Sequence, residues 1–124
     1  MNLIEGLIDE RQVFMTHDKG FQLDLSGYIS SSSTTMDCTL GIRPEHIHGD
    51  NGLKMDAYYP IQAHTDIVEP MGSDSYLYCT IGQNKITARI RPETTPAEDV
   101  DTTIFFDRSK LHFFQKDSGM RLIP

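Results

Sequence analysis

The sequence has little of what would place the chain in or across a membrane. None of its hydrophobic runs approaches the roughly 18 residues that a membrane-spanning helix needs. Residues 1–6 lack a basic flank and a long apolar core, so a secretory signal peptide is not expected. The expectation is therefore a cytoplasmic chain with no direct membrane insertion.

Cysteine is also scarce, with only Cys38 and Cys79 among the 124 residues. Both lie in apolar stretches typical of strands, where a free cysteine behaves as a small hydrophobic residue. Because disulfides are rare in proteins that are not exported, a bond between the two is not favoured. We expect two buried, reduced thiols.

Basic residues are too few for a polyanionic partner. Eleven Lys and Arg stand against eighteen Asp and Glu, which gives a formal net charge of -7 at pH 7. Binding to a phosphate backbone needs a basic surface, and so does binding to anionic lipid. The composition therefore predicts no nucleic acid and no anionic membrane surface as a partner.

The motifs of common catalytic and cofactor sites are missing from the sequence. It has neither Gly-x-x-x-x-Gly-Lys-Ser/Thr nor Gly-x-Gly-x-x-Gly, the glycine-rich turns that hold nucleotide phosphates. Cys-x-x-Cys, His-Glu-x-x-His and Gly-x-Ser-x-Gly are also missing, so no redox pair, zinc protease or serine nucleophile is indicated. We expect no enzymatic activity and no cofactor.

Histidines supply one weak candidate for a metal site. His46 and His48 would lie on one face of an extended segment, and with His64 or His112 they would form part of a zinc or nickel site. No third ligand stands at a typical spacing. The alternative, surface histidines near a turn, is favoured, and no metal is expected.

What the sequence does contain is the two-residue alternation of β-strands. Apolar and polar residues alternate, or β-branched and aromatic residues gather, over residues 21–25, 76–81, 85–91 and 102–107. Residues 82–84, Gly-Gln-Asn, predict a hairpin. Short helical turns are predicted at residues 44–46 and 108–110, and loops or turns at residues 30–35, 50–52 and 92–101. This pattern predicts an all-β fold, either a sandwich or a small barrel.

Four segments, taken together, resemble a known family. They are residues 1–6, residues 40–46 (Leu-Gly-Ile-Arg-Pro-Glu-His), residues 66–74 and the closing residues 106–114. Their order and spacing are similar to the C-terminal regulatory region, containing the TOBE domain, of maltose-type sugar-importer ATPases of the ATP-binding cassette (ABC) class. The chain departs from the family at residues 97–101, where a glycine is usual, and at Gln115, where aspartate is common.

The resemblance implies an all-β fold of two intertwined OB-fold-like β-barrels. Residues 1–124 would be one TOBE-type regulatory domain lacking the nucleotide-binding domain. The implied function is non-catalytic: regulation and dimerisation of the ATP-binding subunit of an importer for sugar or a related solute. The partners would be the nucleotide-binding domain and a second copy of the subunit, peripheral to the inner membrane. The alternative is a sensor domain that binds a small oxyanion or metabolite.

The candidate regulatory residues form two groups. Arg43, Glu45 and His46 follow the end of a strand, because a proline holds the residue before it in an extended conformation. Arg43 and Glu45 would form either a structural corner or a polar bridge between the two halves. The resemblance makes the second group, Glu69, Gly72 and Asp74, candidates for a partner-facing surface, although a plain corner turn is an equal alternative.

Three further expectations concern individual residues. Gly72 would supply a backbone conformation or a close approach that a Cβ atom would block. In the sensor alternative, Arg43, Arg89 and Arg91 would hold an anion. In the closing segment, Leu111 and Phe114 are expected to be core anchors and His112 a structural histidine. If this segment is extended, Leu111 and Phe113 share one face.

Overall fold

The computed structural model describes residues 1–18, 20–26, 35–49, 55–116 and 118–119. The strands are β1 (Asn2–Ile8), β2 (Val13–Thr16), β3 (Gln22–Asp24), β4 (Met36–Ile42), β5 (Ile47–His48), β6 (Tyr58–Pro70), β7 (Ser75–Ile81), β8 (Asn84–Ile90), β9 (Val100–Asp107) and β10 (His112–Gln115). The short 3-10 helices are η1 (Pro44–His46), η2 (Met55–Ala57), η3 (Pro92–Thr94) and η4 (Arg108–Lys110). The fold is all-β, as predicted. In the described residues, no helix is long and apolar enough to cross a membrane.

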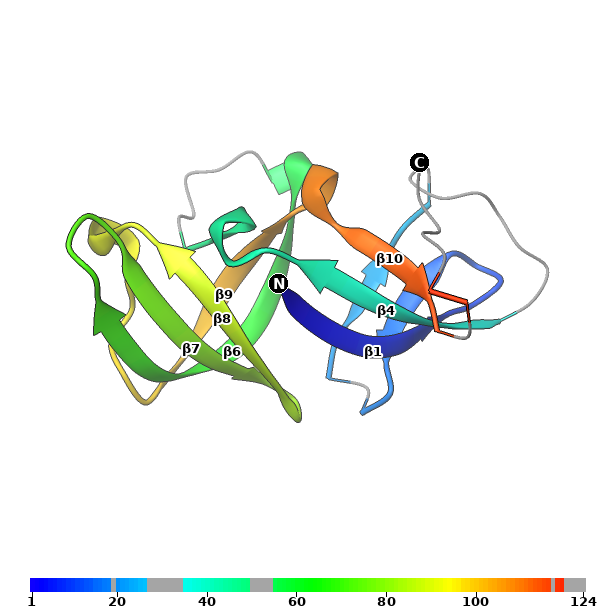
Figure 1. Cartoon of the computed structure of the whole chain (residues 1–124), viewed down its shortest axis with the longest axis horizontal. Coiled ribbons are helices and arrows are strands. Elements are labelled where there is room, and N and C mark those ends of the chain that lie inside the picture. Colours follow the sequence, from blue (N-terminus) through cyan, green and yellow to red (C-terminus); the bar gives the residue numbers. More distant parts are fainter. Residues whose placement is uncertain (19, 27–34, 50–54, 117, 120–124) are drawn as a thin grey trace.

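The strands form two five-stranded antiparallel sheets that share one order, β3-β2-β1-β4-β10 and β8-β7-β6-β9-β5. Each sheet contains a meander of three strands, a fourth strand paired with the first strand of the meander, and a fifth beside the fourth. The sheets curl into two adjoining OB-fold-like barrels, which lie at opposite ends of the molecule (Figure 1).

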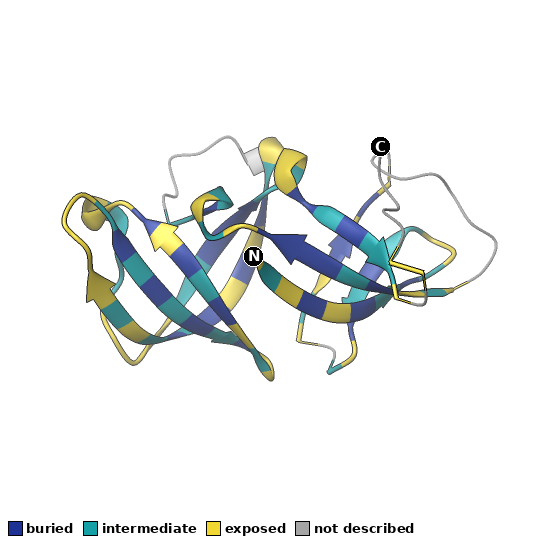
Figure 2. Ribbon diagram, in the orientation of Figure 1, coloured by how far each residue is buried: buried dark blue, intermediate teal, exposed yellow. Residues whose placement is uncertain are grey.

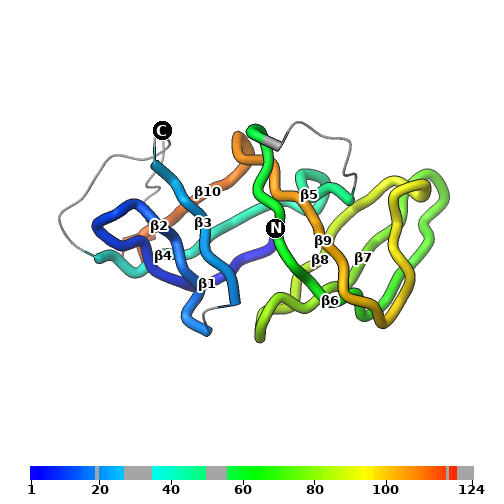
Figure 3. The backbone as a smooth tube through the Cα atoms, turned by 180° about the vertical axis from the view of Figure 1, so that it is seen from behind, coloured from blue at the N-terminus to red at the C-terminus, as the bar shows by residue number. Residues whose placement is uncertain are grey.

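The two barrels exchange their fifth strands. The chain leaves β4 of the first barrel, passes through η1, and pairs β5 with β9 of the second. It later leaves β9, passes through η4, and returns to pair β10 with β4 of the first. The view from behind shows both crossings near the middle of the molecule (Figure 3). The predicted intertwining of two OB-like halves is therefore confirmed.

The strand alternation builds a hydrophobic core in each barrel. In β7, every second residue from Ser75 to Ile81 is buried, and Figure 2 shows the resulting bands along the strands. Cys38 and Cys79 are 0% and 1% exposed and form no disulfide, as predicted. Burial raises the pKa of both thiols to about 12.

Aromatic side chains join the two cores. The ring of Phe21, from the first barrel, meets that of Phe106, from the second, edge to face at 6.1 Å between centroids. The hydroxyl of Tyr59 at the start of β6 donates to the carbonyl oxygen of Asp24 at the end of β3. The barrels therefore form one continuous body.

Local predictions are largely confirmed. Residues 82–83 connect β7 to β8 as a hairpin, in which Gly82 has a φ of +61°. The turns at residues 44–46 and 108–110 are 3-10 helices. The loop predicted over residues 92–101 contains η3, and β9 begins two residues earlier than expected, at Val100. The predictions for residues 30–34 and 50–52 lie outside the described residues.

One core prediction is wrong. Leu111 and Phe113 do share the buried face, but Phe114 is only half-buried, and its ring stacks on that of His112 at 6.4 Å. The reason is that β10 lies wholly in the first sheet, so its outer face points away from that core.

Candidate functional site

A cavity of about 490 Å³ lies on the second barrel, beside the crossing from β4 to β5. Its polar lining comes from four parts of the chain: Glu45 on η1, His48 on β5, Asp74 before β7, and Arg89, Arg91 and Thr94 at the end of β8 and on η3. Its volume lies within the range typical of small-molecule sites.

Two copies of the sequence Ile-Arg-Pro-Glu shape this cavity. One spans residues 42–45 and ends β4, and the other spans residues 90–93 and ends β8. In both, the isoleucine is buried, the arginine is extended (φ -77° and -65°), and the proline begins a 3-10 helix. A proline disfavours the helical region for the residue before it, so both strands end at the same point of the motif.

The two motifs contribute different side chains to the cavity. Glu45 lines it from the first copy, and Arg91 lines it from the second. Gly49 lies against the second turn, where an added Cβ atom would be 2.8 Å from the carbonyl oxygen of Thr94. The backbone after β5 and the backbone of η3 therefore pack closely on this side of the cavity.

Side chains of opposite charge line the cavity. Nε of Arg89 donates to Oδ2 of Asp74 at 2.9 Å, and this contact raises the pKa of Arg89. The pKa of Glu45 is lowered, chiefly by a hydrogen bond from its own backbone and then by the positive charges of His46, Arg43 and Arg89. The Glu45 carboxylate and the Arg89 guanidinium therefore remain charged at neutral pH.

The turn between β6 and β7 carries the second group of predicted residues. Gly72 has a φ of +89°, and a Cβ atom there would meet nothing within 4 Å, so the glycine serves the backbone conformation rather than a close approach. Met71 N–H donates to the carbonyl oxygen of Asp74 at 2.8 Å and closes the turn. Oε1 of Glu69 accepts a hydrogen bond from the hydroxyl of Tyr78 at 3.2 Å.

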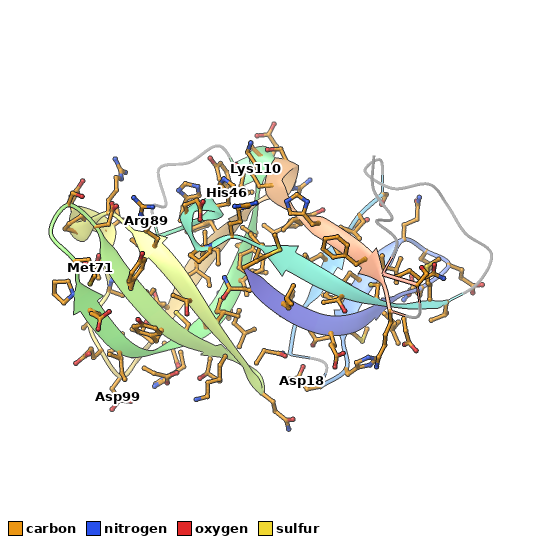
Figure 4. The ribbon with its side chains drawn as sticks, viewed as in Figure 1. Asp18, His46, Met71, Arg89, Asp99 and Lys110 are labelled. Atoms are coloured by element: carbon orange, nitrogen blue, oxygen red, sulfur yellow. The ribbon has the colours of Figure 1, made fainter. Side chains whose placement is uncertain are left out.

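The structure thus brings together Glu45 and Asp74, one from each predicted group, with Arg89 and Arg91. Arg43, which was expected to bridge to Glu45, is exposed and makes no ion pair with it among the described contacts. Figure 4 shows His46 near the middle of the molecule, Met71 at the outer end of the second barrel and Arg89 between them.

Thr94, one of the lining residues, was missed by the sequence reasoning, and His48 was considered there only as a metal ligand. The signal that could have found them is the repetition of Ile-Arg-Pro-Glu, because it marks two strand ends of the same geometry. The first of these strand ends belongs to the first sheet and the second to the second sheet, so the repeat marks two places where the chain turns out of a strand in the same way.

The histidines considered as metal ligands lie in separate environments. His48 packs edge-on against Tyr58 at 5.4 Å, and His112 stacks on Phe114. His64 lies between two carboxylates, but they contact opposite ring nitrogens and share no common point. Among the described residues, no three ligands converge on one position.

Comparison with known families agrees with this architecture. A model of the MalK OB fold domain matches residues 1–47, and a model of the TOBE domain matches residues 40–114. The chain belongs to the TOBE domain family. The two matches meet at the first Ile-Arg-Pro-Glu motif, where the chain crosses between barrels.

Its relatives are ATP-binding subunits of importers. The sn-glycerol-3-phosphate import ATP-binding protein UgpC of Escherichia coli K12 is 28% identical over 123 residues, which are 98% of this chain and 33% of the relative. The sulfoquinovosyl glycerol transport ATP-binding protein SmoE of Agrobacterium fabrum is 35% identical over 78 residues, which are 63% of this chain and 21% of the relative. The chain spans a third or less of these proteins, and the resemblance seen in the sequence is confirmed.

Among solved structures, the cytoplasmic molybdate-binding protein ModG, with molybdate bound, has a similar fold. The TM-score is 0.70 over 90% of this chain and 94% of that chain. With 9% sequence identity, the likeness concerns the fold alone.

Proposed function

We propose that the chain is the non-catalytic regulatory and dimer-stabilising domain of the ATP-binding subunit of an importer for a sugar or a related solute. The observation that carries this proposal is the match of a TOBE domain model to residues 40–114 in a chain whose relatives are import ATP-binding proteins. ATP hydrolysis would belong to the nucleotide-binding domain of the subunit. The subunit would sit on the cytoplasmic side of the inner membrane, attached through the transporter complex.

The fold suits a domain that transmits force between partners. Exchange of β5 and β10 ties each barrel to the other at two crossings, so the barrels cannot separate without breaking strand pairs. A rigid two-barrel body in each subunit can keep two subunits in contact while their ATPase domains open and close. In this proposal, the partner-facing surface includes Glu69, Gly72 and Asp74, with Arg43, Glu45 and His46 beside the crossing.

The proposal is tested by comparing an ATP-binding subunit that carries this chain with a form from which it is deleted. After ATP is removed, we expect the complete subunit to sediment as a dimer and the deleted form as a monomer. Both forms should hydrolyse ATP, because the catalytic groups belong to the other domain. Equal dimer fractions for the two forms in analytical ultracentrifugation would contradict the dimer-stabilising role.

A second candidate function is sensing of a small ligand. It is supported by the cavity lined by Arg89 and Arg91, two of the arginines that the sensor alternative named. The likeness in fold to a molybdate-binding protein supports it further. Ligand binding here would change the subunit's behaviour from within the regulatory domain, so the two functions are compatible.

A further inference from the structure

We propose that the cavity between the two Ile-Arg-Pro-Glu turns binds a small polyol through neighbouring hydroxyl groups, rather than a bare oxyanion. The proposal rests on the second proposed function and names the class of ligand. It follows from the charge, geometry and size of the cavity.

Charge balance decides the class. The cavity is lined by two guanidinium groups, of Arg89 and Arg91, and by two carboxylates, of Glu45 and Asp74. A bare oxyanion in the cavity would face both carboxylates, and like charges repel. A ligand with hydroxyl groups meets no such repulsion, because each hydroxyl both donates and accepts a hydrogen bond.

A carboxylate beside a guanidinium matches two neighbouring hydroxyls. A carboxylate accepts the hydrogen of one hydroxyl, while a neighbouring guanidinium donates to the oxygen of the next. Asp74 and Arg89 already stand side by side, with their contact atoms 2.9 Å apart. Adjacent hydroxyls of a sugar or glycerol fit this donor–acceptor pair.

The cavity is built rather than assembled by chance from flexible side chains. Two proline-directed 3-10 turns fix the backbone of Glu45 and Arg91. Asp74 sits on a turn that contains Gly72 with a positive φ and is closed by the hydrogen bond from the Met71 N–H to the Asp74 carbonyl oxygen. Gly49 lies so close to η3 that an added Cβ atom would be 2.8 Å from the carbonyl oxygen of Thr94. A site that is ordered before binding loses less entropy when its ligand arrives.

The test uses nuclear magnetic resonance titration of the 15N-labelled chain with four probes: glycerol, D-glucose, sn-glycerol 3-phosphate and inorganic phosphate. We expect saturable shifts at the amides around Glu45, Arg89 and Thr94 with at least one hydroxylated probe, and none with phosphate alone. Binding of glycerol or glucose would indicate a free polyol, whereas binding of sn-glycerol 3-phosphate alone would indicate a phosphorylated one.

The substitution Glu45→Gln separates a polyol site from an anion site. It replaces a carboxylate acceptor by the weaker amide oxygen and adds an N–H donor, so polyol binding should weaken on the order of tenfold. Binding of an oxyanion should tighten instead, because a repulsive charge has gone. Glu93→Gln, at the equivalent position of the second motif and outside the cavity lining, is the matched control and should leave both unchanged.

Two results would overturn the proposal. One is saturable binding of inorganic phosphate that tightens in Glu45→Gln. The other is the lack of saturable shifts around the cavity with any of the four probes at about 100 mM, a concentration high enough to detect a millimolar site. Because binding is measured on the chain alone, either failure leaves the dimer-stabilising function, which is tested on the whole subunit, untouched.

Discussion

Asn2 and Thr87 form a reciprocal pair of hydrogen bonds across the junction of the two barrels. Nδ2 of Asn2 donates to the carbonyl oxygen of Thr87 at 2.7 Å, and the N–H of Thr87 donates to Oδ1 of Asn2 at 2.8 Å. The same Nδ2 lies 3.2 Å from the carbonyl oxygen of Ile42. The side-chain amide of Asn2, on β1, thus makes the two hydrogen bonds to Thr87 of β8 that a neighbouring strand would make. It links the barrels where their backbones do not pair.

Substitution of Asn2 by alanine should destabilise the chain by about 1–3 kcal/mol, because it leaves the part-buried backbone groups of Thr87 without partners. Urea denaturation of the parent and of Asn2→Ala measures this difference. Asn2→Asp is the informative companion, since it keeps an acceptor for the Thr87 N–H but loses the donor. Equal stability of Asn2→Ala and the parent would show that the pair contributes nothing.

A second link joins Asp18 of the first barrel to the β7–β8 hairpin of the second. The Asp18 carboxylate accepts hydrogen bonds from the hydroxyl of Thr16 at 2.6 Å and from the N–H groups of Gly20 and Gln83 at 3.0 and 2.5 Å. These donors lower its pKa to about 2. Figure 4 shows Asp18 below the junction of the barrels.

The depressed pKa of Asp18 predicts the pH dependence of this link. The folded pKa is about 2 and the ordinary value is 3.8. The stabilisation is therefore complete above the ordinary value and is lost as the pH falls through the folded one. Asp18→Asn should flatten the loss of stability in this acid range, and exchange of the Gln83 amide should become faster. A parent and variant with parallel stability curves in acid would rule out this role.

Phe113 and Phe114 offer a matched test of which face of β10 supports the core. Phe113 is 0% exposed and meets Phe14 edge to face at 5.4 Å, whereas Phe114 lies on the half-buried outer face. Phe113→Ala should cost about 3–5 kcal/mol, and Phe114→Ala should cost only about 1 kcal/mol. Thermal unfolding of both variants checks the order, and Phe113→Leu serves if the alanine variant does not fold. A reversed order would contradict the assignment of the buried face.

The sequence could predict the faces of single strands but not the partners of all of them. Leu77 and Cys79 follow a period that any half-buried strand requires, so their burial is readable locally. The exchange of β5 and β10 cannot be read from local sequence, because the two residues of β5 pair with a strand more than fifty positions away. Phe114 was misassigned for this reason, since its face depends on which barrel receives the strand.

The candidate site was predictable in its parts and not as a whole. Glu45 and Asp74 stand in segments that resemble the family, and Arg89 and Arg91 were suspected as anion ligands. Their convergence depends on the curl of the second sheet and on the crossing from β4 to β5, which bring the two groups to one cavity. Local sequence patterns carry no information about how close these side chains lie in the folded chain.

His64 connects β6 to the start of β9 and the turn before it. Nδ1 lies 2.9 Å from Oδ1 of Asp101, and Nε2 lies 3.0 Å from Oδ1 of Asp99, which has a φ of +58° and is labelled in Figure 4. Hydrogen bonds to Asp101 and then Asp99 raise the pKa of His64 above its ordinary value of 6.5. Only the protonated ring carries an N–H on both nitrogens, so only that form donates to both carboxylates.

The raised pKa of His64 predicts a loss of stability on the alkaline side. Stabilisation from the pair of contacts is complete below the ordinary value of 6.5 and is lost as the pH rises through the raised folded value. His64→Gln, which cannot become charged, should remove this dependence, while His17→Gln, at a position outside the cluster, should retain it. Nuclear magnetic resonance titration of the His64 ring gives its pKa directly. A measured pKa at or below 6.5 would refute this account, because the two carboxylates would then not favour the protonated ring. A parent protein whose stability does not fall between neutral pH and the folded pKa would refute it as well.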